Sequence, residues 1–141
     1  MPLVHPAPGG VKGRMIMNTI YRIWYSKEPT ERDSSKEFLV YIGRTKNDLT
    51  QRIRQHFMEH PFQKKLDIKG VSHIDYTTFS TVADMYVAEI LLINQYKPPL
   101  NVDDKARDEL TLPIELPPIE WTRWEKPQLM EKWKNDRRTA F

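Results

Sequence analysis

The order of strand-like and helical patterns constrains this chain more than any other feature of its sequence. Residues 18–25, 38–43 and 73–80 are rich in β-branched and aromatic side chains, which favour β-strands. A helical pattern that ends near His60 lies between the second and third of these segments, and another covers residues 81–96. This order predicts an α/β (α+β) domain of the type β-β-α-(α)-β-α, in which a small three-stranded antiparallel sheet is flanked by helices.

The first predicted helix has an apolar stripe and recognisable ends. It begins either with a capping box of Thr45 and Asp48 or with Asn47 as the N-cap. Pro61 stops it, and residues 62–66 predict a short helical piece beyond the stop. The stripe consists of three apolar residues at intervals of four: Leu49, Ile53 and Phe57.

The second predicted helix is the longest. Thr81 with Asp84 forms its capping box, and the prolines that follow Lys97 end it. The strands before it are joined by a long polar loop at residues 26–36.

Composition divides the chain into three parts. Residues 1–14 hold three prolines and three glycines without an apolar period, which predicts a disordered leader. Either Met15 or Met17 is then the natural start. Residues 15–102 form the predicted domain, and residues 103–141 form an acidic, proline-bearing C-terminal extension.

The extension is predicted to pack against other structure. It contains a helical pattern around residues 127–138. Large aromatic side chains are usually buried, so its tryptophans predict packing against the domain or against a second subunit. They are three of the four in the chain: Trp121, Trp124 and Trp133.

Charge and composition exclude several classes of protein. The net charge is +3, but residues 1–70 carry 13 basic and 7 acidic side chains whereas residues 71–141 carry 9 and 12. The basic half suits a polyanion, although a solvated helical face is an equal reading of the charge alone. The absence of cysteine excludes disulfides and thiolate metal sites. No segment has the apolar length of a membrane helix or of a signal peptide, which predicts a cytoplasmic protein.

Glu89 is the most informative single residue. Helical periodicity places it about 140° around the second helix from Asp84, on the apolar side, with Met85 and Ile93 one turn away. A buried carboxylate is costly unless it is paired or holds a metal. The sequence leaves two interpretations: an ion pair with an arginine, or a metal ligand.

Two further pairs are chemically suggestive. Arg52 and His56 lie four residues apart on one face of the first helix, where the arginine could hold a phosphate. A surface arginine beside a half-buried histidine is the alternative. Tyr21 and Tyr41 lie on consecutive strands, which by itself indicates ordinary cross-strand packing.

Taken together, these residues resemble the GIY-YIG endonuclease family over residues 18–102. Two features depart from the family pattern: Thr19 stands where the first motif usually has glycine, and twenty residues separate Tyr21 from Tyr41. The matching residues occur in one order: Ile20-Tyr21, Tyr41-Ile42-Gly43, Arg52, His56, Glu89 and Asn101.

The resemblance implies a metal-dependent hydrolysis of DNA. Glu89 would hold one Mg²⁺, for which Mn²⁺ would substitute, and the metal would stabilise the leaving 3′ oxygen. Arg52 would neutralise the scissile phosphate. Tyr41 or Tyr21 would orient or deprotonate the attacking water, which requires that a nearby cation, Arg44, Arg52 or His56, lower the pKa of the phenol.

The remaining implied roles are supporting ones. Gly43 and Asn101 would support the site. One site cuts one strand, so cutting both strands would require a homodimer or a second binding event. Basic residues would hold the DNA backbone: Arg44, Lys46, Arg54, Lys64 and Lys65.

Two alternatives compete with the nuclease. Residues 56–60 match the H-x-x-E-H pattern of a zinc peptidase, in which His56 and His60 would be the metal ligands, although Pro61 follows directly. The other alternative is a module that binds DNA without cutting it. The acidic Glu89 argues against this module, because an unpaired buried carboxylate repels phosphate.

Overall fold

Long antiparallel strands form the centre of the molecule. The computed structural model describes residues 17–27, 36–59, 66–102 and 105–140. Strand β1 (Asn18–Lys27) pairs on one side with β2 (Lys36–Thr45) and on the other with β3 (Val71–Phe79). A two-residue strand, β4 (Thr122–Arg123), continues the sheet beyond β3, so that the order is β2-β1-β3-β4.

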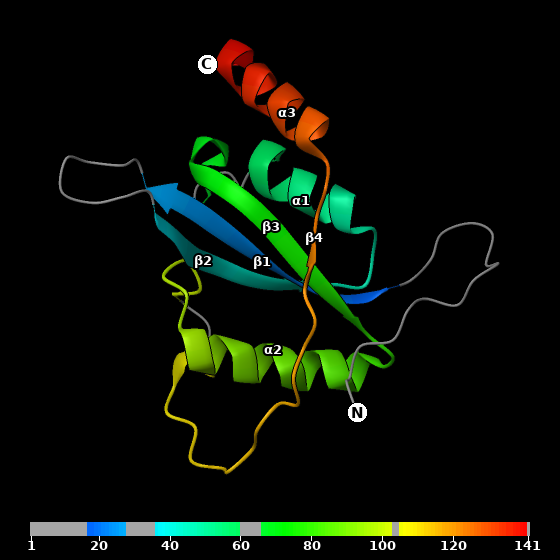
Figure 1. Cartoon of the computed structure of the whole chain (residues 1–141), viewed down its shortest axis with the longest axis vertical. Helices are drawn as coiled ribbons and strands as arrows, with labels where there is room; N and C mark the ends of the chain where they lie inside the picture. The colour runs from blue at the N-terminus through cyan, green and yellow to red at the C-terminus, as the bar shows by residue number, and fades with distance from the viewer. Residues whose placement is uncertain (1–16, 28–35, 60–65, 103–104, 141) are drawn as a thin grey trace.

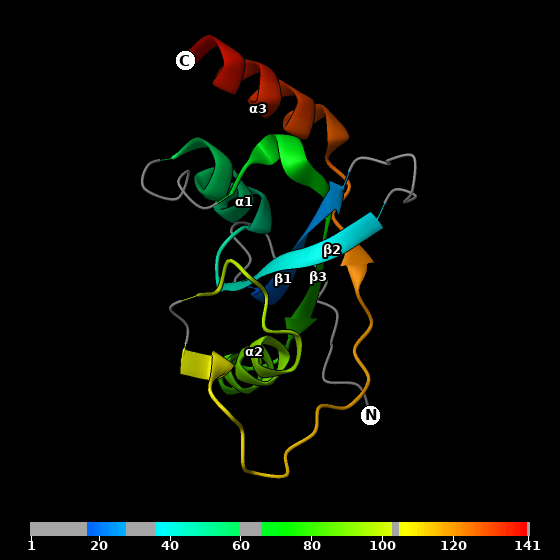
Figure 2. The same cartoon turned by 90° about the vertical axis from the view of Figure 1, so that its left-hand side faces the viewer.

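The sheet separates two helical layers (Figures 1 and 2). Helices α1 (Leu49–Met58) and α3 (Pro127–Ala140) lie on one side, and α2 (Val82–Tyr96) lies on the other. Short 3₁₀ helices, η2 (Ile68–Gly70) and η3 (Lys105–Arg107), occur in the connections. The α+β class predicted from the sequence is confirmed.

Alternation along the strands produces two apolar cores, one for each face. Tyr21 and Ile23 of β1 pack with Ile53 and Phe57 on the face covered by α1. Ile20 of the same strand packs on the opposite face with side chains from β2, β3 and α2. Successive residues of β1 therefore point into different cores. The candidate site residues described below are likewise divided between the two faces of the sheet.

The C-terminal extension is part of the sheet and of both faces. Trp124 and Trp133 stack, with ring centroids 6.1 Å apart, and both are buried in the core on the α1 face. Trp121 lies on the other face, with its ring 3.7 Å from the guanidinium carbon of Arg22. Arg22 in turn donates two hydrogen bonds, of 2.7 and 2.6 Å, to Asp75. Packing against the domain, one of the two outcomes predicted for these tryptophans, is the one observed.

Several sequence-based boundaries need correction. Among the described residues the sheet has four strands, not the predicted three. The sequence did not predict β4 because a strand of two residues is too short to show an alternating pattern. The strands β1 and β2 extend to Lys27 and from Lys36, which shortens the predicted loop at residues 26–36, and β3 begins at Val71. Residues 1–14, and most of the short helical piece at 62–66, lie outside the described residues.

The helix ends also differ in part from the prediction. The N-cap of α1 is Asp48, whose Oδ1 accepts from the Thr50 N–H at 2.8 Å. The box of Thr45 with Asp48 is wrong because Thr45 still belongs to β2, and Asn47 donates its N–H to the Thr45 hydroxyl. For α2 the predicted cap is confirmed, since Thr81 Oγ1 accepts from the Asp84 N–H at 3.0 Å.

Within the described part of the chain, no helix is long and apolar enough to span a membrane.

Replacing Trp124 with alanine should destabilise the fold by about 3–5 kcal/mol, because it removes a buried aromatic ring and leaves a cavity. Urea denaturation followed by circular dichroism measures the free energy of unfolding. Leu112→Ala is the matched control, since Leu112 is 62% exposed. A loss below about 1 kcal/mol for Trp124→Ala would show that the extension is not part of the cooperative fold.

Candidate active site

Gly43 allows two tyrosine rings to meet above the sheet. Gly43 lies opposite Tyr21 in the β1–β2 register. A Cβ at position 43 would approach Tyr21 Cζ to 2.5 Å and Tyr41 Cε2 to 2.8 Å, so any side chain here would displace one of the two rings. Since Tyr21 is fully buried, its ring has no room to move. Glycine is therefore required for close packing, and the ring centroids of the two tyrosines lie 6.3 Å apart.

The hydroxyl of Tyr21 is hydrogen-bonded to the Nε2 atom of His56 on α1. Burial, and secondarily the neighbouring Tyr41, raise the pKa of Tyr21, while Arg52 acts in the opposite direction. Burial, together with the charge of Arg52, lowers the pKa of His56 to about 3. Both groups are thus neutral near pH 7, and the tautomer of His56 decides which of them donates the hydrogen bond.

Arg52 places a positive charge beside this pair. It lies one turn before His56 on α1, and its Nη1 donates to Gln55 Oε1 at 3.3 Å. It also acts on the Tyr21 hydroxyl by charge and by hydrogen bonding. The alternative of a surface arginine beside a half-buried histidine does not hold, because His56 is buried and Arg52 is half-buried.

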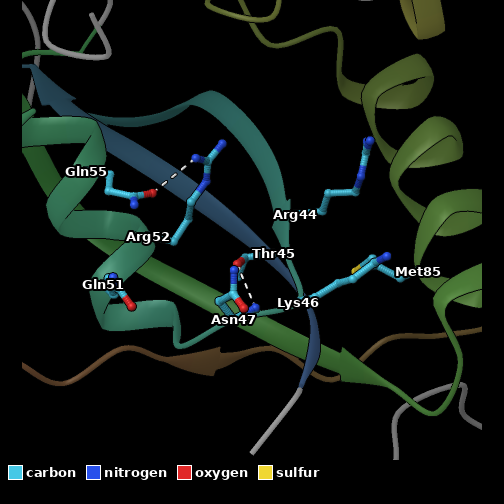
Figure 3. Close-up of a pocket in the computed structure, with 8 residues that line it drawn as sticks. All are labelled: Arg44, Thr45, Lys46, Asn47, Gln51, Arg52, Gln55 and Met85. Atoms are coloured by element: carbon cyan, nitrogen blue, oxygen red, sulfur yellow. Dashed lines mark hydrogen bonds between the residues drawn. The ribbon is translucent and has the colours of Figure 1, made fainter. Parts of the chain in front are cut away.

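Arg52 faces a cavity of about 310 Å³ between α1, the end of β2 and α2 (Figure 3). From β2 and the turn after it, Arg44 and Lys46 extend toward α2. Three of the lining side chains are cationic, and the described lining includes no acidic one. The lining residues are Arg44, Thr45, Lys46, Asn47, Gln51, Arg52, Gln55 and Met85.

Glu89 turns inward from α2, as helical periodicity predicted, and is 7% exposed. Its Oε1 forms an ion pair with Nη1 of Arg44. The guanidinium carbon of Arg44 also lies 4.5 Å from the centroid of the Tyr86 ring. Burial alone would lower the pKa of Arg44, but Glu89 and Tyr86 together raise it. The negative charge of Glu89 also contributes, as a minor cause, to the raised pKa of the Tyr21 phenol.

Asn101 fastens the outer edge of β2. Its Oδ1 accepts from the Ile42 N–H at 3.0 Å, and its Nδ2 donates to the Ile42 carbonyl at 2.9 Å. The Leu100 N–H donates to the Val40 carbonyl at 3.0 Å, so residues 100 and 101 continue the ladder along this edge. The side chain therefore fixes the strand position next to Gly43 and does not face the cavity lining described above.

Comparison with known proteins identifies this arrangement. The family model of the GIY-YIG catalytic domain matches residues 17–101, which is more than half of the chain. The chain belongs to the GIY-YIG family. No curated protein and no solved structure matches it. The family is one of nucleases that act on DNA, and the predicted resemblance is confirmed over almost the same residues.

The GIY-YIG site gathers most of the residues predicted from the sequence. Tyr21, Tyr41 and His56 share ring contacts, and the Tyr41 and His56 centroids lie 5.0 Å apart. Thr19, at the position where the family motif usually has glycine, is buried in β1 opposite Thr45. It contributes packing at the base of the site.

Some predicted DNA-binding residues lie elsewhere. Arg54 points away from the cavity lining and pairs with Glu59 at 3.0 Å on the surface of α1. Lys64 and Lys65 lie outside the described residues. The sequence analysis missed the neutral lining residues Thr45, Asn47, Gln51 and Gln55, although the spacing of the two glutamines around Arg52 places them on adjoining parts of α1.

The zinc-peptidase pattern lacks its helix. Helix α1 ends at Met58, two residues earlier than predicted, and Glu59 is an extended C-cap residue that pairs with Arg54. Two histidines four residues apart share a face only if both lie in one helix, and α1 ends before position 60. His60 itself lies outside the described residues. The Nε2 atom of His56 is engaged by Tyr21.

The buried His56 predicts a pH-dependent stability. Its pKa is near 3 in the folded chain and about 6.5 when unfolded, so the unfolded chain binds the extra proton. The stabilisation is complete above pH 6.5 and is lost as the pH falls toward 3. From pH 7 to pH 5 the wild type should lose about 2 kcal/mol more than His56→Gln, as measured by urea denaturation. Equal losses in both proteins would refute the lowered pKa.

Proposed function

We propose that this chain is a metal-dependent endonuclease that hydrolyses DNA phosphodiester bonds at the cavity between α1 and α2. The observation that supports this proposal best is a cationic cavity with two buried groups behind its wall: the Tyr21–His56 pair lies behind Arg52, and the carboxylate of Glu89 pairs with Arg44. The family supplies the nuclease class and the DNA substrate. The assignment of the metal and of each role is our proposal.

The cavity suits a phosphate of the DNA backbone. Arg44, Lys46 and Arg52 supply positive charge, and the amide side chains between them supply neutral hydrogen-bond donors. Such contacts position the backbone without reading the base sequence. Affinity for DNA should therefore fall as the salt concentration rises.

A single magnesium ion fits the donor set around Glu89. The described residues contain no group of three or more His, Cys, Asp or Glu side chains that could enclose a metal. One carboxylate suits Mg²⁺, which keeps most of its waters and completes its shell with substrate oxygens, and Mn²⁺ should substitute. The Glu89 oxygen already takes a cationic partner in Arg44. When bound, the metal would supply Lewis-acid stabilisation of the leaving 3′ oxygen.

Arg52 neutralises the charge that builds on the scissile phosphate. Its position in the cavity wall leaves it facing the substrate, and its contact with the Tyr21 hydroxyl orients it. Tyr21 and His56 form the buried support for this arginine. Gly43 and Asn101 hold the strand that carries Tyr41.

Tyr41 is our assignment for the phenol that orients the attacking water. It is half-buried, whereas Tyr21 is fully enclosed and its hydroxyl is hydrogen-bonded to His56. The raised pKa of Tyr21 also keeps its hydroxyl protonated near pH 7, so that it cannot take a proton from water. A water at Tyr41 would be held by hydrogen bonding and would pass its proton to solvent as its oxygen bonds to phosphorus. The bond from phosphorus to the 3′ oxygen would break in the same reaction, and the 3′ oxygen would take a proton from solvent.

The geometry of one site limits what a single molecule does. One cavity hydrolyses one strand, so we propose that double-strand cleavage requires a homodimer or a second binding event. The products would be a 5′-phosphate and a 3′-hydroxyl.

Replacing Glu89 with glutamine should reduce the nicking of supercoiled plasmid in 5 mM MgCl₂ by at least about 10³-fold, because the amide loses the charge that holds the cation. Binding of DNA in EDTA should persist, since a negative charge is removed. The control is Glu109→Gln, at an exposed carboxylate. A folded Glu89→Gln variant that nicks at the wild-type rate would refute the mechanism, and a wild type that binds plasmid without nicking would indicate the non-catalytic module.

The two tyrosines should separate kinetically. Tyr41→Phe should lower the single-turnover cleavage rate by about 10²–10⁴-fold while the free energy of unfolding changes little. Tyr21→Phe removes the hydrogen bond to His56 and should mainly lower the stability, by about 1–3 kcal/mol. A reversed pattern, with the rate lost only in Tyr21→Phe, would assign the water to Tyr21.

A further inference from the structure

The ion pair between Arg44 and Glu89 joins a buried group to a half-exposed one. The side chain of Glu89 is 9% exposed, whereas that of Arg44 is 47% exposed. Arg44 therefore contacts the buried carboxylate with its guanidinium and at the same time forms part of the wall of the cavity. One side of its guanidinium rests over the Tyr86 ring, which Lys46 also approaches, at 5.8 Å.

A buried carboxylate needs a positive partner at all times. Removing one member of such a pair leaves an uncompensated charge in a region of low dielectric constant, which is strongly destabilising. In the structure the guanidinium of Arg44 meets this need through Glu89 Oε1. A divalent cation at the same carboxylate would meet it equally well.

The two cations compete for one place. A guanidinium hydrogen-bonded to Oε1 and a metal bound to the same carboxylate would lie within a few ångströms of each other, where like charges repel strongly. We therefore expect a metal that binds Glu89 to displace Arg44 from the carboxylate. The displaced side chain has room to move, because Arg44 lines the neighbouring cavity, and the Tyr86 ring beside its guanidinium in the paired position offers a further contact for the cation.

We propose that Arg44 is a built-in counter-ion of the metal site: it neutralises Glu89 until a divalent cation binds, and then moves from the carboxylate toward the cavity. This inference rests on the proposed function, because it takes Glu89 as the metal ligand. It makes Arg44 a positioning residue that sets the affinity of the site for metal. The alternative is a permanent structural ion pair that has no connection with metal binding.

Metal affinity without DNA gives the first test. Titration calorimetry with MnCl₂ at pH 8 should show Arg44→Gln binding Mn²⁺ about tenfold more tightly than the wild type, because no competing cation has to leave. Lys46→Gln is the matched control, since it removes the same charge beside the same ring but no contact with Glu89, and it should change the affinity by about twofold at most. Equal affinities of Arg44→Gln and the wild type would overturn the proposal.

Rescue of stability by metal gives the second test. Without metal, Arg44→Gln should melt about 10 °C below the wild type because Glu89 is left uncompensated. Addition of MnCl₂ should restore most of this loss in Arg44→Gln, but not in the double variant Arg44→Gln/Glu89→Gln. A loss that MnCl₂ does not reverse would establish the purely structural pair.

The design also covers a variant that does not fold. If Arg44→Gln folds only when MnCl₂ is present, the metal replaces the arginine as proposed, and Arg44→Lys should then retain both the fold and the wild-type affinity. Failure of the proposed function is distinguishable, because it would appear as a wild type that neither binds Mn²⁺ nor nicks plasmid. If the wild type nicks plasmid with Mn²⁺ but Arg44→Gln binds Mn²⁺ with unchanged affinity, the proposed nuclease stands and only the role of Arg44 as counter-ion is refuted.

Discussion

The enclosed contact between Tyr21 and His56 connects the sheet to the helix that carries the site. Tyr21 belongs to the central strand β1, and its hydroxyl reaches the buried face of α1 because Gly43 leaves room for the ring. The histidine makes this hydrogen bond in its neutral form, because burial and the charge of Arg52 strongly lower its pKa. Arg52, one turn away, is thereby held at a fixed distance from the strands.

Local patterns in the sequence predicted the main elements and the inward turn of one residue. The positions of β1, β2, β3, α1 and α2 follow from periodicities of two and of about 3.6. The burial of Glu89 follows in the same way, because a helix of known start places each side chain on a known face. The cap at Thr81 was equally local, since donor and acceptor lie three residues apart.

Long-range contacts explain most of what the sequence did not predict. Arg44 and Glu89 are 45 residues apart, and their pairing depends on how α2 lies against the end of β2. Strand β4 exists because the edge of β3 accepts two residues from the extension, not because those residues form a pattern. Thr45 shows where local patterns fail: its side chain is suited to cap a helix, but the residue pairs with Thr19 in the sheet instead.

The indole of Trp124 donates a hydrogen bond of 3.2 Å to the Thr50 hydroxyl, in the first turn of α1. Thr50 lies two residues before Arg52, while Trp124 lies well beyond the last residue of the family match. A segment outside the residues that the family model matches thus anchors the first turn of α1, the helix that carries Arg52. A chimera that grafts residues 17–101 alone onto a foreign DNA-binding protein would carry every motif of the family and still lack the anchor of its principal helix.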